Sequence, residues 1–111
     1  MKHIKIRNLG PIKEADIELK RINVIIGPQS SGKSCVLKTA CYCTWVEKRI
    51  ELTQSADFFA KDGNFTKEFE RFHKLKGYIK PDTFISYESE FMSFSFDNAS
   101  NKFNFKWNEG R

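Results

Sequence analysis

The sequence predicts an α/β fold in which N-terminal strands lead into a phosphate-binding loop and a helix, followed by an antiparallel, aromatic-rich β-hairpin. The first observation is the run 27–34, which matches the pattern G-x-x-x-x-G-K-[ST] at every fixed position. The second is the apolar, β-branched run 22–26, which is typical of a buried parallel strand. The third is the alternation of aromatic and polar residues beyond Pro81.

Three strands are expected before the loop. Apolar and charged residues alternate over 4–7 and again over 15–20, as in strands with one buried face. The segment 8–11 between them reads Asn-Leu-Gly-Pro, which is a turn signal. We expect the first two strands to be antiparallel neighbours and the third, at 22–26, to enter the phosphate loop.

The loop at 27–34 has the chemistry to hold a polyphosphate, because a helix start offers unpaired N–H groups and the positive end of the helix dipole. Lys33 is expected to reach the β- and γ-phosphates, and the Ser34 hydroxyl to coordinate magnesium. An ordinary strand-to-helix turn is the competing interpretation, and the complete motif favours the phosphate site. The predicted nucleotide-binding residues here are Gly27, Pro28, Gln29, Ser30, Ser31, Gly32, Lys33, Ser34 and Cys35.

A long helix is predicted from Ser34 to about Leu52. Because its apolar residues cover more than one side, we expect it to pack against a sheet and against a further element. The residues at helical spacing are Val36, Ala40, Cys43 and Ile50, and those that widen the apolar surface are Leu37, Cys41 and Trp45.

The middle of the chain predicts a loop over 53–64 and a second helix over 65–76, with Gly77 placed to end it. Its buried side is expected to carry Phe65, Phe69 and Phe72. Its opposite side carries Lys67, Arg71 and Lys74, which fit either a nucleic-acid contact or a solvated face. We favour the solvated face, because acidic residues lie among them.

The C-terminal part predicts an extended stretch at 84–87 and then a hairpin with strands near 92–96 and 103–107, joined by a turn at 97–101. Aromatic strands can stack nucleic-acid bases, but we favour an aromatic face packed on the core.

Composition is that of one folding domain of 111 residues, 40% hydrophobic and 14% aromatic. We divide it into 1–52, 53–82 and 83–111. The net charge of +5 suits phosphate ligands without identifying them.

With no leader and no long apolar run, we expect a soluble, cytoplasmic chain without a membrane partner. The three cysteines, all on the predicted helix, are expected to be buried reduced thiols and not metal ligands.

The residues from Ile4 to Gly10, a second strand, and the run from Ile22 to Ser34 together resemble the start of an ABC-type ATPase head. Within that group the chain is most similar to the RecF/SMC branch and the related bacterial AAA-family ATPases. The resemblance covers residues 2–45, and the later hairpin is similar to the antiparallel layer that such heads insert. It implies a partial P-loop NTPase lobe that binds ATP and Mg²⁺.

The resemblance also implies that Arg7 and Asn8 lie near the nucleotide, although the same residues could merely form the turn. Three residues depart from the family pattern. Gln29 replaces the usual Asn, Ser30 replaces the usual Gly, and Cys35 replaces a Ser or Thr. At Cys35 only the main-chain N–H is therefore expected to contact phosphate.

Hydrolysis in that family needs parts that this sequence does not contain. No apolar run ends in Asp-Glu to serve as a Walker B motif, and there is no Leu-Ser-Gly-Gly-type signature. The nearest candidate, 94–97, has the alternation of a hairpin end. We therefore expect the N-terminal lobe of a larger ATPase, unable to turn over ATP alone and completed by the rest of the head. No catalytic residue is assigned.

Homodimer formation and DNA contact stay open. The alternatives are a fragment of another P-loop class, such as a small kinase, and a non-enzymatic nucleic-acid-binding module.

Overall fold

The computed structural model describes residues 2–19, 30–61, 63–72 and 77–108, with the main chain alone at Leu19 and at 30–34. In this part of the chain, the helices lie between two blocks of strands. The elements in chain order are β1 (Lys2–Leu9), β2 (Ile12–Leu19), α1 (Ser30–Thr53), α2 (Asp57–Ala60), α3 (Asn64–Phe72), β3 (Ile79–Glu88), β4 (Met92–Asp97) and β5 (Lys102–Trp107). The expected mixture of helices and strands is confirmed, and the sheet is antiparallel throughout.

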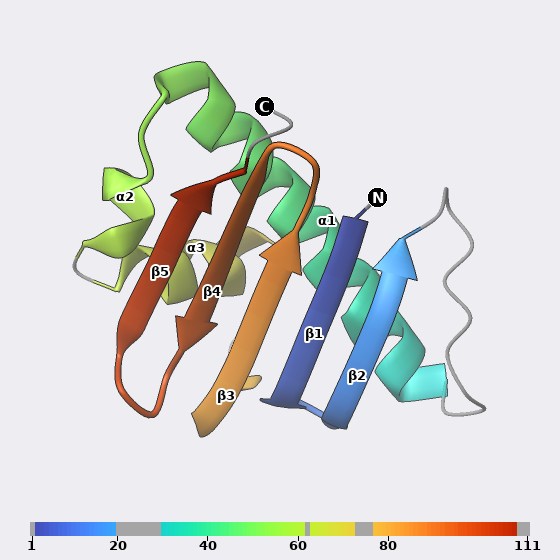
Figure 1. The fold of residues 1–111 in the computed structure, drawn as a ribbon. Coiled ribbons are helices and arrows are strands. Elements are labelled where there is room, and N and C mark those ends of the chain that lie inside the picture. The colour runs from blue at the N-terminus through green and yellow to red at the C-terminus, as the bar shows by residue number, and fades with distance from the viewer. Residues whose placement is uncertain (1, 20–29, 62, 73–76, 109–111) are drawn as a thin grey trace.

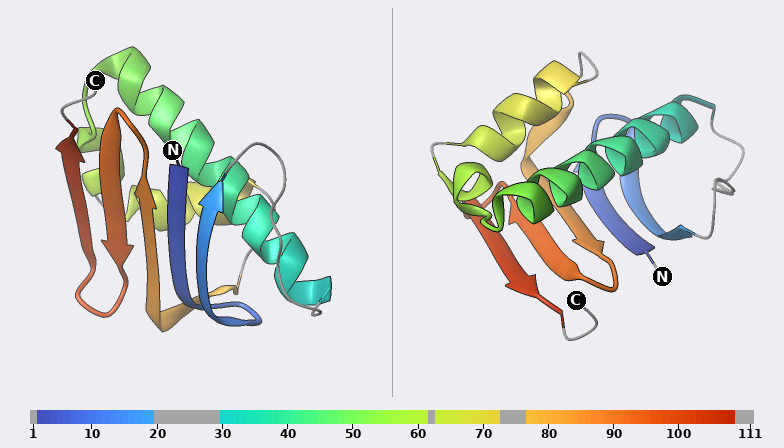
Figure 2. Two further views of the ribbon diagram at one scale, coloured as in Figure 1. Left: turned by 45° about the vertical axis from the view of Figure 1, so that its right-hand side comes forward. Right: turned by 90° about the horizontal axis from the view of Figure 1, so that it is seen from above.

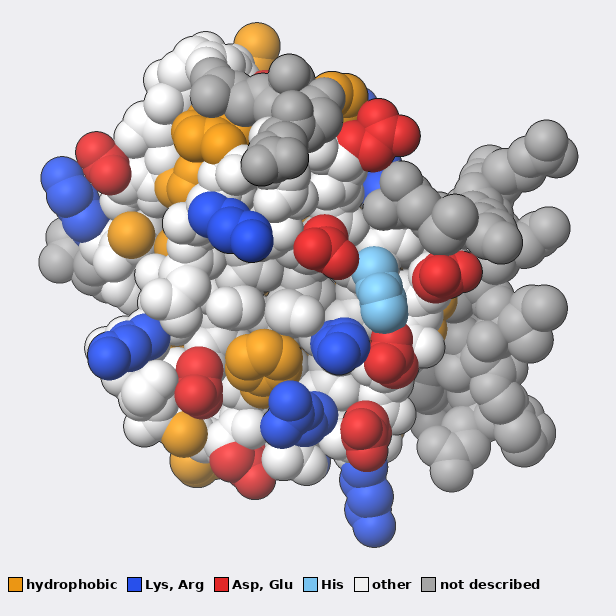
Figure 3. All heavy atoms as spheres, in the orientation of Figure 1, with side chains coloured by type: hydrophobic (Ala, Val, Ile, Leu, Met, Phe, Trp, Pro, Cys, Tyr) orange, Lys and Arg blue, Asp and Glu red, His pale blue; other side chains and the backbone are white. Residues whose placement is uncertain are grey.

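The strands form one five-stranded sheet in the order β2-β1-β3-β4-β5. The helices cover one face of this sheet, and α1 crosses it diagonally from the side of β2 toward the side of β5 (Figures 1 and 2). The opposite face, which we call the outer face, carries basic and acidic side chains mixed together (Figure 3). The molecule therefore has two layers, with its core between the sheet and the helices.

The expected antiparallel pairing of the first two strands is confirmed, with Ile4 opposite Ile17 and Ile6 opposite Ala15. Their turn contains Gly10 at φ +52°, a conformation that L side chains rarely adopt. The Gly10 N–H donates to the Tyr78 carbonyl at 2.9 Å, which ties the turn to the chain just before β3. The predicted third strand at 22–26 lies outside the described residues.

The junction of β1 with β3 is irregular. The register shifts between Arg7 and Leu9, and Asn8 between them has φ 53°, which asparagine tolerates better than most residues. Pro81 lies inside β3, but the pairing of β3 with β4 begins only at Phe84. The proline therefore removes no hydrogen bond from the β3–β4 ladder.

The β4–β5 hairpin is confirmed where it was predicted. Phe94 faces Phe105 and Phe96 faces Phe103 across the two strands. The aromatic side lies under the helices, since the Phe65 ring is 5.3 Å from that of Phe96 and 5.4 Å from that of Phe103 between centroids. These rings belong to the core, as we favoured, and not to a base-stacking surface.

Helix α1 buries the predicted stripe of Val36, Ala40, Cys43 and Ile50 against the sheet. The further element that it was expected to meet is the α2–α3 segment. Tyr42 donates a hydrogen bond to the Phe65 carbonyl at 2.6 Å, and the Trp45 ring lies 5.9 Å from that of Phe59. No helix within the described ranges is long and apolar enough to cross a bilayer.

Four details differ from the sequence-based expectations. Helix α1 begins at Ser30 instead of Ser34, so the second half of the motif is already helical. Helix α2 interrupts the predicted loop, because Phe59 inserts into the core at 3% exposure. Phe72 is 37% exposed at the end of α3, and Cys41 is exposed because its side of α1 faces away from the sheet.

Candidate functional site

The phosphate motif leads into helix α1. Gly27, Pro28 and Gln29 lie outside the described residues, while 30–34 form the first turns of α1. An α-helix leaves about four N–H groups unpaired at its start, and these carry the positive end of its dipole. No acidic residue occurs in this first turn. The main chain at the second half of the motif is therefore suited to an anion.

Cys35, the last predicted phosphate contact, has its side chain in the core at 2% exposure. Burial raises the pKa of its thiol, so the group stays neutral. Its carbonyl accepts a hydrogen bond from Thr39 Oγ1 at 2.8 Å, as expected inside a helix. The thiol is therefore not available to a ligand at the start of α1. Because α1 begins at Ser30, the Cys35 N–H also lies beyond the first four N–H groups, which are the unpaired ones, so its expected contact with phosphate stays a prediction.

Arg7 and Asn8 lie where β1 meets β3. The Arg7 guanidinium stacks over the Phe84 ring at 4.9 Å, and Asn8 Nδ2 donates to Asp82 Oδ2 at 2.9 Å. Thr83 Oγ1 donates to the Asn8 carbonyl. These contacts hold the turn in place, as expected if Arg7 and Asn8 form the turn. Figures 1 and 2 show that α1 begins at this same end of the sheet, where β1 ends and β2 begins.

The segment 94–97, the nearest sequence to a Walker B motif, is the end of β4. Asp97 lies opposite Lys102 in the β4–β5 pairing, and its Oδ1 accepts the Ala99 N–H at 3.1 Å. Its carboxylate is thus used in the hairpin turn. The expectation that this segment is a hairpin end is confirmed.

The basic side of α3 is solvated within the described residues. Lys67 and Arg71 are exposed, and Arg71 Nη1 lies 3.6 Å from Glu68 Oε1. Lys74 lies outside the described residues. The arrangement fits the solvated face that we favoured.

Sequence reasoning missed a buried polar cluster around Glu47, which is 6% exposed on α1. Tyr87 donates to its Oε1 at 2.9 Å, Ser89 Oγ donates to its Oε2, and Lys2 Nζ lies 3.8 Å from Oε1. Desolvation is the main cause that raises the pKa of Tyr87, so its hydroxyl remains a donor. Position 47 continues the buried stripe of α1 at helical spacing, and a carboxylate in that stripe is the signal that could have revealed the cluster.

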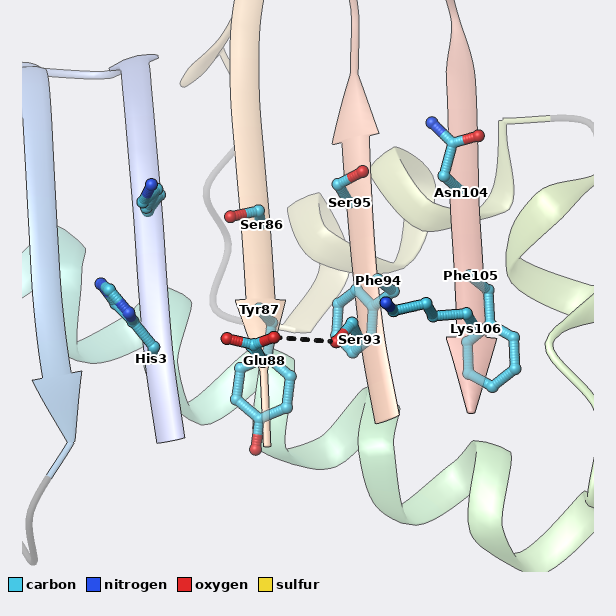
Figure 4. Close-up of a pocket in the computed structure, with 11 residues that line it drawn as sticks. His3, Ser86, Tyr87, Glu88, Ser93, Phe94, Ser95, Asn104, Phe105 and Lys106 are labelled. Carbon is cyan, nitrogen blue, oxygen red and sulfur yellow. Dashed lines mark hydrogen bonds between the residues drawn. The ribbon is translucent and has the colours of Figure 1, made fainter. Parts of the chain in front are cut away.

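A shallow hollow of about 410 Å³ lies on the outer face of the sheet (Figure 4). Short polar side chains line its floor, and Lys5 and Lys106 stand at its sides. Ser93 Oγ, within it, already bonds to Asn108 Oδ1 at 3.2 Å and to Glu88 Oε2 at 3.5 Å. The hollow and α1 lie on opposite faces of the sheet (Figure 4). It is therefore separate from the phosphate motif.

In the described part of the chain, no group of three or more His, Cys, Asp or Glu side chains could hold a metal ion. The magnesium ligand predicted at Ser34 would act together with phosphate oxygens, which is the usual way in which Mg²⁺ is held beside a nucleotide.

Comparisons with known proteins give one family. No curated protein and no solved structure matches the chain. The model of a family described as "AAA domain" matches residues 3–111, which is nearly the whole chain. The match includes the strands before the phosphate motif, the motif itself and the C-terminal hairpin. The chain belongs to this AAA domain family of P-loop ATPases.

Proposed function

We propose that this chain is the ATP-binding N-terminal lobe of a larger ATPase of the ABC type, similar to the RecF/SMC group. The lobe binds the phosphates of a magnesium–nucleotide through the Walker A loop at 27–34. The observation that carries the proposal is the complete motif at the entry to a long helix, in a chain whose family is that of AAA-type ATPases.

Charge at the helix start supports nucleotide binding. A triphosphate is attracted by unpaired main-chain N–H groups, by the helix dipole and by a nearby ammonium group. The first turn of α1 adds no carboxylate that would repel it. In the proposed complex Lys33 contacts the β- and γ-phosphates, Ser34 coordinates Mg²⁺, and Cys35 contributes only its N–H.

The position of Arg7 and Asn8 supports a second contact with the nucleotide. Both belong to the end of β1, and α1 begins at this end of the sheet (Figure 1). The Arg7 side chain is exposed on the outer face, the face opposite α1, where it stacks on Phe84. In the proposed complex it therefore reaches the nucleotide around the end of the sheet, beside the turn.

The proposed lobe binds ATP but does not hydrolyse it. The sequence contains no Walker B or signature motif, and the one segment that approaches a Walker B motif ends a hairpin. The remaining catalytic groups would come from the rest of the ATPase head. A cytoplasmic location, nucleotide-dependent pairing of heads and a role in DNA repair belong to the same proposal.

The test is calorimetric titration of the chain with Mg–ATP. Lys33→Ala removes a charged hydrogen-bond donor, a loss of about 1.5–3 kcal/mol, and should weaken binding about 10- to 100-fold. Lys38→Ala is the matched control, because Lys38 lies on the same helix outside the motif. Ser34→Ala should weaken binding of Mg–ATP more than that of ATP in the presence of a chelator.

Equal affinity of the Lys33→Ala and Lys38→Ala variants would contradict the proposed phosphate contact. Far-UV circular dichroism and thermal unfolding of each variant show whether the fold is retained. Steady release of inorganic phosphate by the purified chain, lost in Lys33→Ala, would contradict the claim that the lobe cannot hydrolyse ATP alone.

A further inference from the structure

Among the strands that the structure describes, β2 and β5 form the two edges of the sheet, and they carry opposite charge on the outer face. On β5 the residues of this face are Lys102, Asn104 and Lys106, all exposed. On β2 they are Glu14, Asp16 and Glu18, also exposed. Figure 3 shows both signs of charge on this face, with acidic side chains gathered toward the right, over β2.

The acidic row of β2 already has a basic neighbour within the chain. Its residues face His3, Lys5 and Arg7 of β1 across the antiparallel pair. The basic row of β5 has no equivalent on β4, because Lys106 lies opposite Ser93 and only Lys102 lies opposite a carboxylate, that of Asp97. The lysines of β5 therefore lack a full row of opposite charges on the neighbouring strand β4, whereas the acidic residues of β2 have such a row on β1.

The core side of β5 is also unusual for an edge strand. Phe103, Phe105 and Trp107 occupy this side and are only half-buried. Proteins usually protect an edge strand with charged side chains, above all lysine, or with proline or a bulge, because unpaired N–H and C=O groups recruit another strand. The segment 102–107 contains no proline, and its two lysines discourage a strand of like charge but suit an acidic one such as β2. Within the described ranges β5 pairs with β4 alone.

Strand direction allows β5 to pair with β2 of another copy. The five strands alternate in direction, so the two edge strands run the same way (Figure 1). A second copy placed beside the first with its helices on the same face would therefore make a parallel β5–β2 pair. Parallel ladders are slightly less stable per residue than antiparallel ones but are regular.

The spacing of the charges matches in that parallel pair. Lys102 and Lys106 are separated along the chain as Glu14 and Glu18 are, so both lysine–glutamate pairs form in one register. In the same register Phe103 and Phe105 approach Ala15 and Ile17, which places aromatic rings beside smaller apolar side chains on the core side. Antiparallel pairing of β5 with itself about Asn104 would instead place Lys102 opposite Lys106 of the second copy.

We propose that copies of this chain associate head to tail, β5 of one copy adding to the β2 edge of the next and continuing the sheet. The contact is heterologous, so it repeats until the ends meet in a ring or the assembly grows as a filament. The inference is independent of nucleotide binding, because neither edge strand contains a residue of the phosphate motif.

Charge reversal on one edge at a time tests this contact. Lys102→Glu with Lys106→Glu gives a copy with two acidic edges, and Glu14→Lys with Glu18→Lys gives a copy with two basic edges. Each variant alone should stay at the single-chain mass of 13.0 kDa in sedimentation or light scattering. An equimolar mixture should associate as the wild type does, because every contact then joins opposite charges.

The control for net charge is Lys48→Glu with Lys67→Glu, which reverses two exposed lysines on the helices and should associate like the wild type. Added salt should weaken the wild-type association, since exposed pairs are screened. Circular dichroism checks that each variant is folded. If a reversed variant is unfolded, Lys102→Gln with Lys106→Gln provides the milder test and should lower association.

Three results would overturn the proposal. One is a wild-type mass that stays at 13.0 kDa over the whole concentration series at low salt. Another is undiminished association of the Glu14→Lys, Glu18→Lys variant, which would indicate pairing of β5 with itself. The third is failure of the two reversed variants to associate when mixed.

Discussion

The three cysteines of α1 lie in different surroundings although they lie close together in the sequence. Cys35 and Cys43 face the sheet and are buried, whereas Cys41 is exposed on the other side of the helix. Burial raises the pKa of both Cys35 and Cys43, so their thiols stay protonated. Because the thiolate is the reactive form, reactivity should follow position on the helix.

Labelling with an aromatic disulfide at neutral pH should therefore modify Cys41 rapidly and the other two only on unfolding. The Cys41→Ser variant should lose the fast phase, and the Cys43→Ser variant should keep it. Absorbance of the released thiolate measures each phase. Rapid modification of all three thiols in the folded chain would contradict the packing of α1 on the sheet.

Glu47 shows what residue-level reasoning from sequence could and could not provide. Helical spacing places position 47 on the buried side of α1, together with Ala40, Cys43 and Ile50. Its partners could not be predicted, because Tyr87 at the end of β3 and Ser89 just after it lie some forty residues away, and Lys2 lies in the first strand. The chain keeps this carboxylate buried because two hydroxyl donors and an ammonium group satisfy it.

At the level of elements, periodicity predicted what is local. The alternation over 4–7 and 15–20 gave β1 and β2, and aromatic alternation gave the β4–β5 hairpin with its turn. Helix α2 was not predicted, because a single turn has too few residues to show a period and depends on the burial of Phe59. The start of α1 differed because residues 30–33 are polar or glycine and show no apolar period that could place the boundary.

The β1–β2 turn makes a prediction that belongs to this level. A Cβ on Gly10 would lie 2.6 Å from Tyr78 Cδ2, and its φ is +52°. Gly10→Ala should therefore combine the left-handed backbone cost, about 1–2 kcal/mol, with an overpacking cost of about 1–3 kcal/mol. Urea unfolding measures the sum as a lower free energy of unfolding.

Gly77→Ala separates the two costs. Gly77 has φ +88°, and a Cβ there would meet nothing within 4 Å. This variant should show the backbone cost alone and be the more stable of the two. A Gly10→Ala variant as stable as Gly77→Ala would indicate that Tyr78 moves aside freely and does not hold the turn.

At the scale of the whole molecule, the sheet order could not be read from the sequence. β1 lies in the sheet between β2, its neighbour in sequence, and β3, more than sixty residues further on, so that Ile6 faces both Ala15 and Ile85. Nothing in the period of either strand specifies this pairing, because alternation fixes the face and not the partner. The spacing of its residues was enough to find the motif at 27–34. Only the structure shows that α1 begins at the end of the sheet where β1 ends and β2 begins.

The two layers are joined most directly through Phe65, which makes it the residue to test for cooperative folding. Its ring packs on Tyr42 of α1, at 5.3 Å between centroids, and on Phe96 and Phe103 of the sheet. Phe65→Ala should lower the free energy of unfolding by about 3–5 kcal/mol, a large share of the roughly 5–15 kcal/mol typical of a domain. Phe58→Ala is the matched control, because Phe58 is 45% exposed on α2 and should cost far less.

Two probes report on the layers separately in the same urea titration. Far-UV circular dichroism follows mainly the helices, and fluorescence in a Trp45→Phe background follows Trp107 on β5. Because Phe65 contacts both layers, the wild-type chain should give coincident transitions at one midpoint. Separate midpoints would show that the sheet is stable without the helices, and equal costs for Phe65→Ala and Phe58→Ala would show that Phe65 does not join the two layers. In that case the core between the two layers would not be the source of the stability of the fold.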